Sequence, residues 1–196
     1  MQSVIGLVGP TSSGKGTVAQ MFRERGYEYY SLSDMIREEA VRRGLDLKVT
    51  RILQDLGDEL RQKFGEAVLA ERTVRKINMS EGRKIVIDSI RHPAEARFLK
   101  GALKATIVGV DALADIRWRR FQERGRDTNV KTIEEFLALD ARETQEPDEP
   151  YKIDVTGCLK LADFTITNEG TPDDLMNEVG RFFKETKETD RRRKEG

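Results

Sequence analysis

Nine residues near the N-terminus have the types and spacing that bind phosphate: Gly9, Pro10, Thr11, Ser12, Ser13, Gly14, Lys15, Gly16 and Thr17. Gly9 and Gly14 permit backbone angles that other residues resist, so the loop's N–H groups can converge on phosphate oxygens at a helix N-terminus. Lys15 adds a cation for β- and γ-phosphates, and the Thr17 hydroxyl suits Mg²⁺. We therefore predict a site for a nucleotide's polyphosphate tail. The alternative is an ordinary glycine-rich turn between a strand and a helix.

A second chemical pattern follows the apolar run 85–87, where Asp88 is joined three residues later by Arg91. A strand that ends in Asp places a carboxylate at the carboxyl edge of a parallel sheet, beside the phosphate loop. There Asp88 can hold Mg²⁺ through water or accept a proton from the acceptor, and Arg91 would lie near the transferring phosphoryl group. The alternative for Asp88 is a helix N-cap. We interpret His92, the only histidine, as a turn residue before Pro93.

Arginines gather in a third segment, where Arg117, Arg120 and Arg124 would share one face of a helix. Three cations on one face without acidic partners repel one another unless an anion arrives. The alternative is a solvated charged surface. An acidic run at 134–149 follows closely and argues against binding of a nucleic-acid backbone.

In this order along the chain, the motifs resemble those of the P-loop nucleoside monophosphate kinases. The string Gly14-Lys15-Gly16-Thr17 is similar to the loop of adenylate kinase, and Asp34 with Arg37 resembles that family's Asp-x-x-Arg helix start. Segment 85–93 resembles a strand and loop of deoxynucleoside monophosphate kinases, and 162–171 resembles the adenine-side loop of dephospho-CoA kinases. The whole chain is most similar to predicted nucleotide kinases related to the adenylate, cytidylate and dephospho-CoA kinases.

The resemblance implies roles for individual residues. Arg37 would grip the acceptor phosphate, with Asp34 helping to position it. Arg120 and Arg124 would contact the donor phosphates, and Arg142 would return from a second helix to close over the transition state. The alternative is that Asp34 only favours a helix N-terminus, while Arg37 is a solvated surface charge.

The resemblance also implies that backbone groups near Asn168 and Gly170 border the donor base. Thr171 before Pro172 fits a helix N-cap as well, and the two interpretations are compatible.

Together these roles imply an ATP-dependent kinase that uses Mg²⁺ and phosphorylates a small phosphorylated acceptor, a (deoxy)nucleoside monophosphate. In this hypothesis Thr17 and Asp88 hold Mg²⁺, while Arg37 and Arg91 hold the acceptor. One alternative is dephospho-CoA kinase, whose ribose hydroxyl acceptor needs a general base such as Asp88. Another is a nucleotide-switched P-loop ATPase that acts through a protein partner.

Composition restricts the remaining possibilities. The chain of 196 residues carries 35 basic and 35 acidic side chains, and zero net charge argues against generic binding of nucleic acids or anionic membranes. Cys158 is the only cysteine, so an intrachain disulfide is excluded. The sequence has neither the pattern of a signal peptide nor an apolar run long enough to span a bilayer. We expect a cytoplasmic enzyme whose partners are small-molecule nucleotides.

Alternating apolar runs and helical patterns must position these residues. We predict strands at 3–8, 27–30, 84–88, 104–110 and 163–167. We predict helices at 15–25, after a cap at Ser33 through Val41, at 51–63 and 66–79, from Pro93, and at 112–124, 131–144 and 172–187. This order predicts an α/β fold of the P-loop NTPase, nucleotide-kinase type: a five-stranded parallel sheet with helices on both faces.

The predicted organisation is a single kinase domain over 1–187. It contains a helical acceptor-binding insertion at about 34–80 and an arginine-rich lid at about 117–142. The charged tail 188–196 lacks apolar periodicity, and we expect it to be disordered.

Overall fold

The computed structural model describes residues 3–77, 83–125 and 127–195, with side chains as far as Thr186. Within these ranges, five parallel strands form one sheet in the order β2-β3-β1-β4-β5. The strands are β1 (Ser3–Val8), β2 (Glu28–Ser31), β3 (Lys84–Ile90), β4 (Thr106–Asp111) and β5 (Phe164–Thr167). The predicted five-stranded parallel sheet is therefore confirmed.

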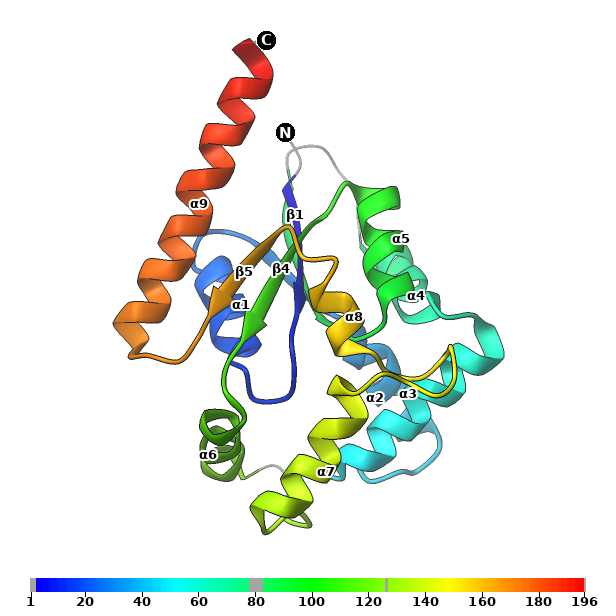
Figure 1. Cartoon of the computed structure of the whole chain (residues 1–196). Helices are drawn as coiled ribbons and strands as arrows, with labels where there is room; N and C mark the ends of the chain where they lie inside the picture. Colours follow the sequence, from blue (N-terminus) through cyan, green and yellow to red (C-terminus); the bar gives the residue numbers. More distant parts are fainter. Residues whose placement is uncertain (1–2, 78–82, 126, 196) are drawn as a thin grey trace.

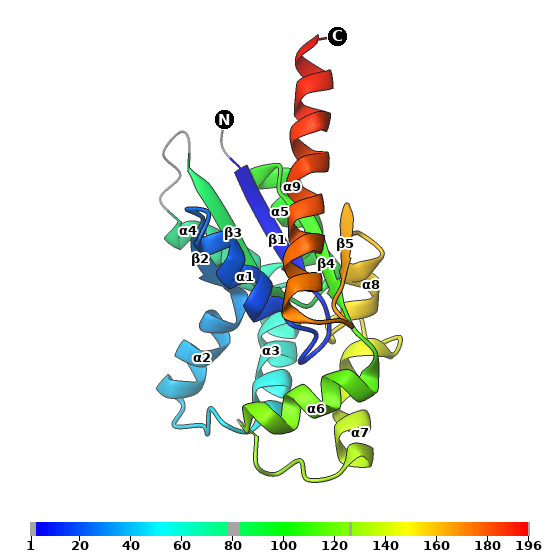
Figure 2. The same cartoon turned by 90° about the vertical axis from the view of Figure 1, so that its left-hand side faces the viewer.

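Helices cover both faces of the sheet, as Figure 1 shows. On one face lie α1 (Lys15–Arg23) and α9 (Pro172–Glu195). On the other lie α2 (Leu32–Arg42), α3 (Thr50–Phe64), α4 (Val68–Lys76), α5 (Pro93–Leu103) and α8 (Val155–Leu159). Two further helices, α6 (Ala114–Arg124) and α7 (Ile133–Thr144), lie beyond the ends of the strands (Figure 2). None of the described helices is long and apolar enough to cross a bilayer.

The central strand β1 contributes side chains to both cores. Ile5 and Leu7 are buried with α1 and α9, whereas Val4 and Val8 are buried with the helices of the opposite face. Successive residues of a strand point to opposite faces, so a strand covered on both sides needs a nearly continuous apolar run. Burial on both faces fixes the point from which the glycine-rich loop leaves the sheet.

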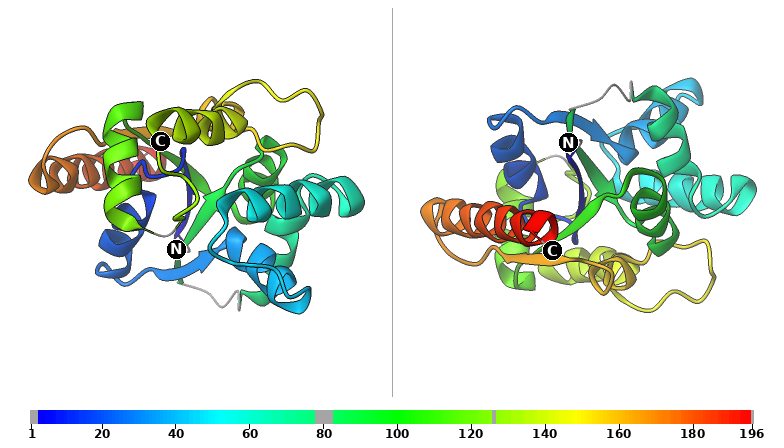
Figure 3. Two further views of the ribbon diagram at one scale, coloured as in Figure 1. Left: turned by 90° about the horizontal axis from the view of Figure 1, so that it is seen from below. Right: turned by 90° about the horizontal axis from the view of Figure 1, so that it is seen from above.

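The carboxyl ends of β1, β3 and β4 meet at one edge of the sheet because these strands are parallel. The glycine-rich loop follows β1, Asp88 lies near the end of β3, and α6 follows β4. Seen from below in Figure 3, α6, α7, α2 and α3 surround this edge. The fold thus brings all three chemical segments of the sequence to one end of the molecule.

The start of α5 decides between two interpretations of Asp88. The His92 Nδ1 accepts a hydrogen bond from the Ala94 N–H, and the Glu95 carboxylate accepts one from the His92 N–H, which together form a capping box. Pro93 occupies the first helical position, as predicted. Since His92 is the cap, the interpretation of Asp88 as an N-cap is wrong.

Several predicted boundaries differ from the structure. The helix that Ser33 was expected to cap begins at Leu32, and its N-cap residue is Ser31 instead. The helix predicted at 66–79 is α4, which ends at Lys76, and positions 78 and 79 lie outside the described residues. The short helix α8 was not predicted.

The charged tail also differs from its prediction. We expected disorder over 188–196, but α9 continues to Glu195, and Gly196 lies outside the described residues. Lys, Arg and Glu have high helix propensity, so a segment rich in them extends a helix without needing an apolar face. In Figure 1 this part of α9 projects beyond the sheet.

Candidate active site

The glycine-rich loop has a backbone that two of its glycines make possible. Gly9 has φ +148, and a Cβ placed there would lie 2.0 Å from the Val110 carbonyl oxygen. Gly14 has φ +102, and its Cβ would lie 2.1 Å from the Asn168 side-chain nitrogen. Both positions combine an unusual backbone angle with close packing, so only glycine fits them without a shift.

Lys15 is buried at the base of this loop. Its Nζ donates hydrogen bonds to the carbonyl oxygens of Gly9 at 2.6 Å and Pro10 at 2.9 Å. Burial, followed by repulsion from Arg91, lowers the pKa of Lys15 to about 8, although Asp88 and Glu143 oppose the shift. The ammonium is therefore buried among both cations and carboxylates, and an arriving anion would stabilise its charged form.

The N-terminus of α1 has no side-chain cap. Gly14 is its N-cap residue, and the Thr17 N–H donates back to the Gly14 carbonyl, so the N–H groups that precede Thr17 in the helix keep their capacity for an anion. Within the described residues, the buried hydroxyls of Ser12 and Ser13 have no hydrogen-bond partner. Buried polar atoms are nearly always paired, so these hydroxyls fit a site that receives phosphate oxygens or water.

Asp88 is buried at the end of β3 and is held from two sides. The Tyr29 hydroxyl donates to its Oδ2 at 3.2 Å, and the Ser89 N–H donates to its Oδ1 at 2.5 Å. Burial and the Asp88 charge raise the pKa of Tyr29 to about 12, so the phenol stays a donor at neutral pH. Sequence reasoning missed Tyr29, which stands in a strand with no local sign of a polar role.

Arg91 faces a carboxylate that sequence reasoning also missed. Its guanidinium forms an ion pair with Glu143 of α7, whose side chain is only 1% exposed. The same carboxylate accepts a hydrogen bond from the Thr11 N–H at 2.9 Å and one from the Gln54 side chain at 2.9 Å. Three distant segments of the chain therefore converge on Glu143.

The backbone of Arg91 is fixed by a buried ion pair. Glu95 accepts hydrogen bonds from the Arg91 N–H at 2.9 Å and from the Arg61 guanidinium at 3.0 Å. The Arg91 carbonyl accepts one from the Asp154 N–H at 2.9 Å. Arg61 is 2% exposed and Glu95 is fully buried, so this pair holds α3 and the start of α5 in register.

The arginines of α6 divide by role. Arg117 is buried, forms a two-point ion pair with Asp140 of α7, and donates to the Ala112 carbonyl at 2.9 Å. Arg120 donates to the Asn168 carbonyl at 3.0 Å and lies 3.5 Å from the Ser13 carbonyl oxygen, next to the phosphate loop. Arg124 is exposed, yet close enough to Lys15 to contribute to its lowered pKa.

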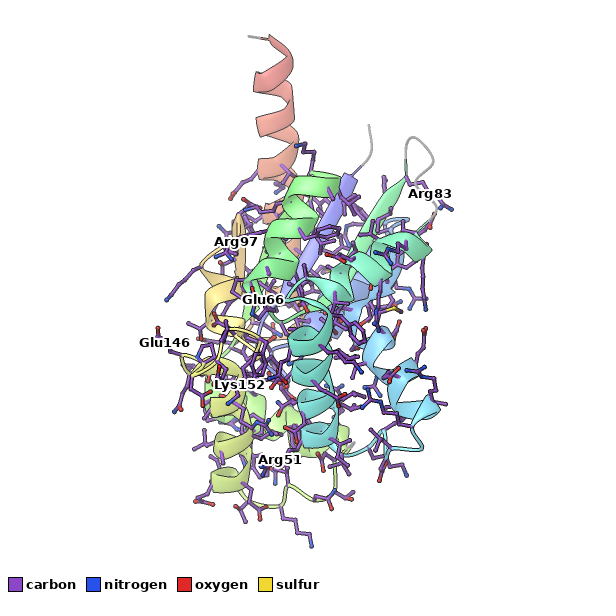
Figure 4. The ribbon with its side chains drawn as sticks, turned by 90° about the vertical axis from the view of Figure 1, so that its right-hand side faces the viewer. Arg51, Glu66, Arg83, Arg97, Glu146 and Lys152 are labelled. Carbon is purple, nitrogen blue, oxygen red and sulfur yellow. The ribbon has the colours of Figure 1, made fainter. Side chains whose placement is uncertain are left out.

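Arg142 lies on α7 and pairs with Asp55 of α3 rather than with the loop. Arg51, which stands one helical turn before Asp55, lies at the same end of the molecule as α7 (Figure 4). The structure thus brings Lys15, Asp88, Arg91 and Arg120 around the loop, whereas Arg142 is engaged elsewhere.

Asp34 and Arg37 lie on the first turns of α2, beside the end of β3. They line a depression on the surface together with Glu38 and Val41. Partial burial raises the pKa of Asp34, Arg37 opposes the shift, and the Asp88 charge adds to it. The predicted acceptor residues are therefore neighbours of Asp88, on the side away from α9.

The turn after β5 connects the loop to α9. The Asn168 side chain donates to the Ser13 carbonyl at 2.8 Å. The Thr171 hydroxyl accepts from the Asp174 N–H at 3.2 Å, which confirms the predicted N-cap. A Cβ on Gly170 would lie 2.5 Å from the Asp174 carboxylate, so this glycine gives the cap its room.

The residues present fit a magnesium ion bound through a nucleotide. Among the described residues, no three His, Cys, Asp or Glu side chains gather as a metal cluster. Mg²⁺ in kinase sites keeps several waters and takes one or two protein oxygens in addition to phosphate oxygens, so a cluster is not required. The exposed Thr17 hydroxyl and the Asp88 carboxylate are oxygen donors of this kind.

Comparison with known proteins supports a P-loop assignment. A family model described as an AAA domain matches residues 8–136. A UPF0200/UPF0201 protein of Archaeoglobus fulgidus is 33% identical over 184 residues, which is 92% of this chain and 54% of that protein. The chain thus spans about half the length of that relative. A UPF0200 protein of Pyrococcus horikoshii is 32% identical over 181 residues, which is 90% of this chain and 93% of that protein.

Solved structures share the fold. A crystal structure of a Thermus thermophilus protein has a TM-score of 0.58 and 25% identity, and the match covers 94% of this chain and 97% of that one. Shikimate kinase from Acinetobacter baumannii, in complex with shikimate, has a TM-score of 0.57 and 15% identity, with 96% and 95% covered. These likenesses show the P-loop kinase fold.

Proposed function

The chain belongs to the UPF0200 family, and we propose that it is a kinase that transfers a phosphoryl group from ATP to a (deoxy)nucleoside monophosphate. Phosphoryl transfer needs little covalent help from a protein, because positioning and electrostatic stabilisation supply most of the catalysis. The groups at the carboxyl edge of the sheet are of this kind: loop amides, an ammonium, guanidinium groups and the carboxylates of Asp88 and Glu143.

One observation carries the proposal. The N-terminus of α1 has no side-chain cap, the buried Lys15 ammonium lies at its start, and the buried hydroxyls of Ser12 and Ser13 have no partner among the described residues. An uncapped helix N-terminus with a lysine at its start, and with Asp88 at the end of the neighbouring strand, suits a polyphosphate and its Mg²⁺. The ion would neutralise charge on the phosphates when bound.

The residues divide between donor and acceptor. Lys15 and the loop amides would hold the donor, with Arg120 and Arg124 beside its phosphates. Asp88, held by Tyr29, would accept a hydrogen bond or a proton on the acceptor side.

The acceptor would lie between Asp88 and the start of α2. There Arg37 would offer a planar pair of N–H donors to its phosphate, and Arg91 would lie near the transferring group.

Incubation with labelled ATP, Mg²⁺ and a set of acceptors tests the proposal. The set comprises nucleoside and deoxynucleoside monophosphates, dephospho-CoA, shikimate and gluconate. We expect transfer to a monophosphate. Transfer to dephospho-CoA instead would favour a ribose hydroxyl acceptor with Asp88 as the base, and transfer to none would contradict a kinase.

An Arg37→Ala variant then tests the acceptor site. We expect its KM for the monophosphate to rise at least roughly tenfold while the affinity for ATP is kept, because a charged hydrogen bond to phosphate is lost. Arg42→Ala on the same helix is the matched control, since the Arg42 side chain is 76% exposed and Arg43 also pairs with its partner Glu39. An equal effect of both substitutions would argue against a phosphate clamp.

A further inference from the structure

The carboxylate of Glu143 has the surroundings of a bound phosphate. It accepts hydrogen bonds from the Thr11 N–H at 2.9 Å, from the Thr11 hydroxyl at 2.9 Å and from the Gln54 side chain at 2.9 Å. Arg91 forms an ion pair with it, and Lys15 lies within electrostatic reach. A loop amide, a hydroxyl, a guanidinium and an ammonium are the donors that proteins use for phosphate oxygens.

This carboxylate is charged in the folded protein. Burial alone would raise the pKa of Glu143, but Arg91, Lys15 and the hydrogen bonds from Gln54 and Thr11 together hold it below its usual range. Glu143 therefore brings a full negative charge to the loop. The neighbouring Lys15 ammonium points to the Gly9 and Pro10 carbonyl oxygens.

The cations beside Glu143 indicate which phosphate the carboxylate resembles. In a P-loop the amides of the loop cradle the α- and β-phosphates, and the lysine reaches the β- and γ-phosphates. Glu143 lies within electrostatic reach of Lys15 and forms an ion pair with Arg91, which the proposed function places near the transferred group. Its carboxylate thus stands at the terminal end of the polyphosphate path.

We propose that Glu143 and the donor's terminal phosphate compete for the same hydrogen-bond donors, so that ATP must displace Glu143 whereas ADP leaves it in place. This inference rests on the proposed function, because it assumes a nucleotide in the loop. It makes Glu143 a determinant of selectivity between tri- and diphosphate. It also means that Glu143 can return to this position once the terminal phosphoryl group has been transferred.

The contacts of α7 explain how displacement of Glu143 would affect the predicted lid. Asp140 binds Arg117 of α6, Arg142 binds Asp55 of α3, and Glu143 binds the loop, all within one turn of α7. Displacing Glu143 therefore changes how α7 is seated against three neighbours at once.

Calorimetric titration of ATP and of ADP into the native chain and into Glu143→Gln tests the proposal. The amide keeps the shape and an acceptor oxygen but removes the charge. We expect ATP affinity to rise roughly tenfold relative to ADP affinity, in the range of typical couplings between sites. Glu134→Gln, at an exposed position of the same helix, is the control and should leave both affinities unchanged.

A second measurement uses the native chain and does not depend on how the variant folds. Trp118, the only tryptophan, packs against Phe136 of α7 with ring centroids 5.5 Å apart. Its fluorescence should change with ATP and not with ADP.

Three results would overturn the proposal: ATP affinity unchanged or weaker in Glu143→Gln, equal changes for both nucleotides, or the same Trp118 response to both. If neither protein binds any nucleotide, the proposed function fails as well. Normal binding with no selective effect of Glu143→Gln would remove this inference alone.

Discussion

The phosphate loop and the helix pair α6–α7 differ in what fixes their charged groups. Lys15 is held by the carbonyls of Gly9 and Pro10, at most 6 residues away in sequence. In the helix pair, Arg117 binds Asp140 at a separation of 23 residues, and Arg142 binds Asp55 at 87. The loop is thus built from local sequence, whereas the helix pair is held by long-range ion pairs of Arg117 and Arg142.

This difference explains why the arginines of α6 do not all lie beside the loop. Arg117 has a structural role, since its guanidinium is buried against α7. Arg120 remains beside the loop through the oxygens of Asn168 and Ser13. A row of like charges on a helix therefore does not reveal which member meets a ligand.

The largest expected loss of stability follows from a substitution that removes the ion pair between α6 and α7. Arg117→Ala should lower the free energy of unfolding by about 3–5 kcal/mol, because it leaves the Asp140 carboxylate buried without its partner. Arg119→Ala on the same helix removes an ion pair whose two side chains are 71% and 57% exposed, and it should cost less than about 1 kcal/mol. Urea denaturation of both variants checks this. Equal losses would mean that the long-range pair does not hold α6 to α7.

A slightly smaller loss of stability is expected from a substitution that disrupts the loop. Gly9→Ala forces an alanine into φ +148 with its Cβ 2.0 Å from the Val110 carbonyl oxygen, and it should cost about 3 kcal/mol in stability. Gly101→Ala in α5 is the control, because a Cβ there meets nothing within 4 Å and should leave the melting temperature equal or higher. Thermal unfolding gives both values. A Gly9→Ala protein as stable as the native one would contradict the packing of the loop.

The smallest expected effect is a pH dependence of ATP affinity that comes from the protonation of Lys15. In the free protein burial and Arg91 lower its pKa to about 8, whereas an anion in the loop would raise it. Above about pH 8 the protein must take up a proton to bind ATP, so affinity should fall by up to roughly tenfold per pH unit. Titrations in two buffers with different ionisation enthalpies measure that uptake. Constant affinity between about pH 7 and 9.5 would show that the ammonium does not take part.

The sequence predicted the sheet and the loop because both rest on local patterns. Apolar runs marked the strands, and the spacing of Gly9, Gly14 and Lys15 marked the loop. The N-cap of α2 was misplaced by two residues, since Ser31 and Ser33 both suit an N-cap. The helix α8 was missed because five residues after Asp154 are too few to show a period.

Glu143 could not have been identified as a site residue from its surroundings in sequence. It belongs to an acidic stretch that reads as a solvated helix, and its partners Thr11 and Arg91 are 132 and 52 residues away. The buried Arg61–Glu95 pair, 34 residues apart, was hidden for the same reason. Charged residues that pair across the fold look in sequence like those that face water.

Binding of ATP to the native chain and to Lys15→Met, measured by titration calorimetry at neutral pH, tests the central claim most directly. The substitution keeps a long side chain but removes the ammonium that the loop holds. The account predicts that the native chain binds ATP and that Lys15→Met binds it roughly a hundredfold more weakly, as expected when a charged hydrogen bond to phosphate is lost. A native chain that binds no ATP, or a variant that binds it equally well, would contradict the account.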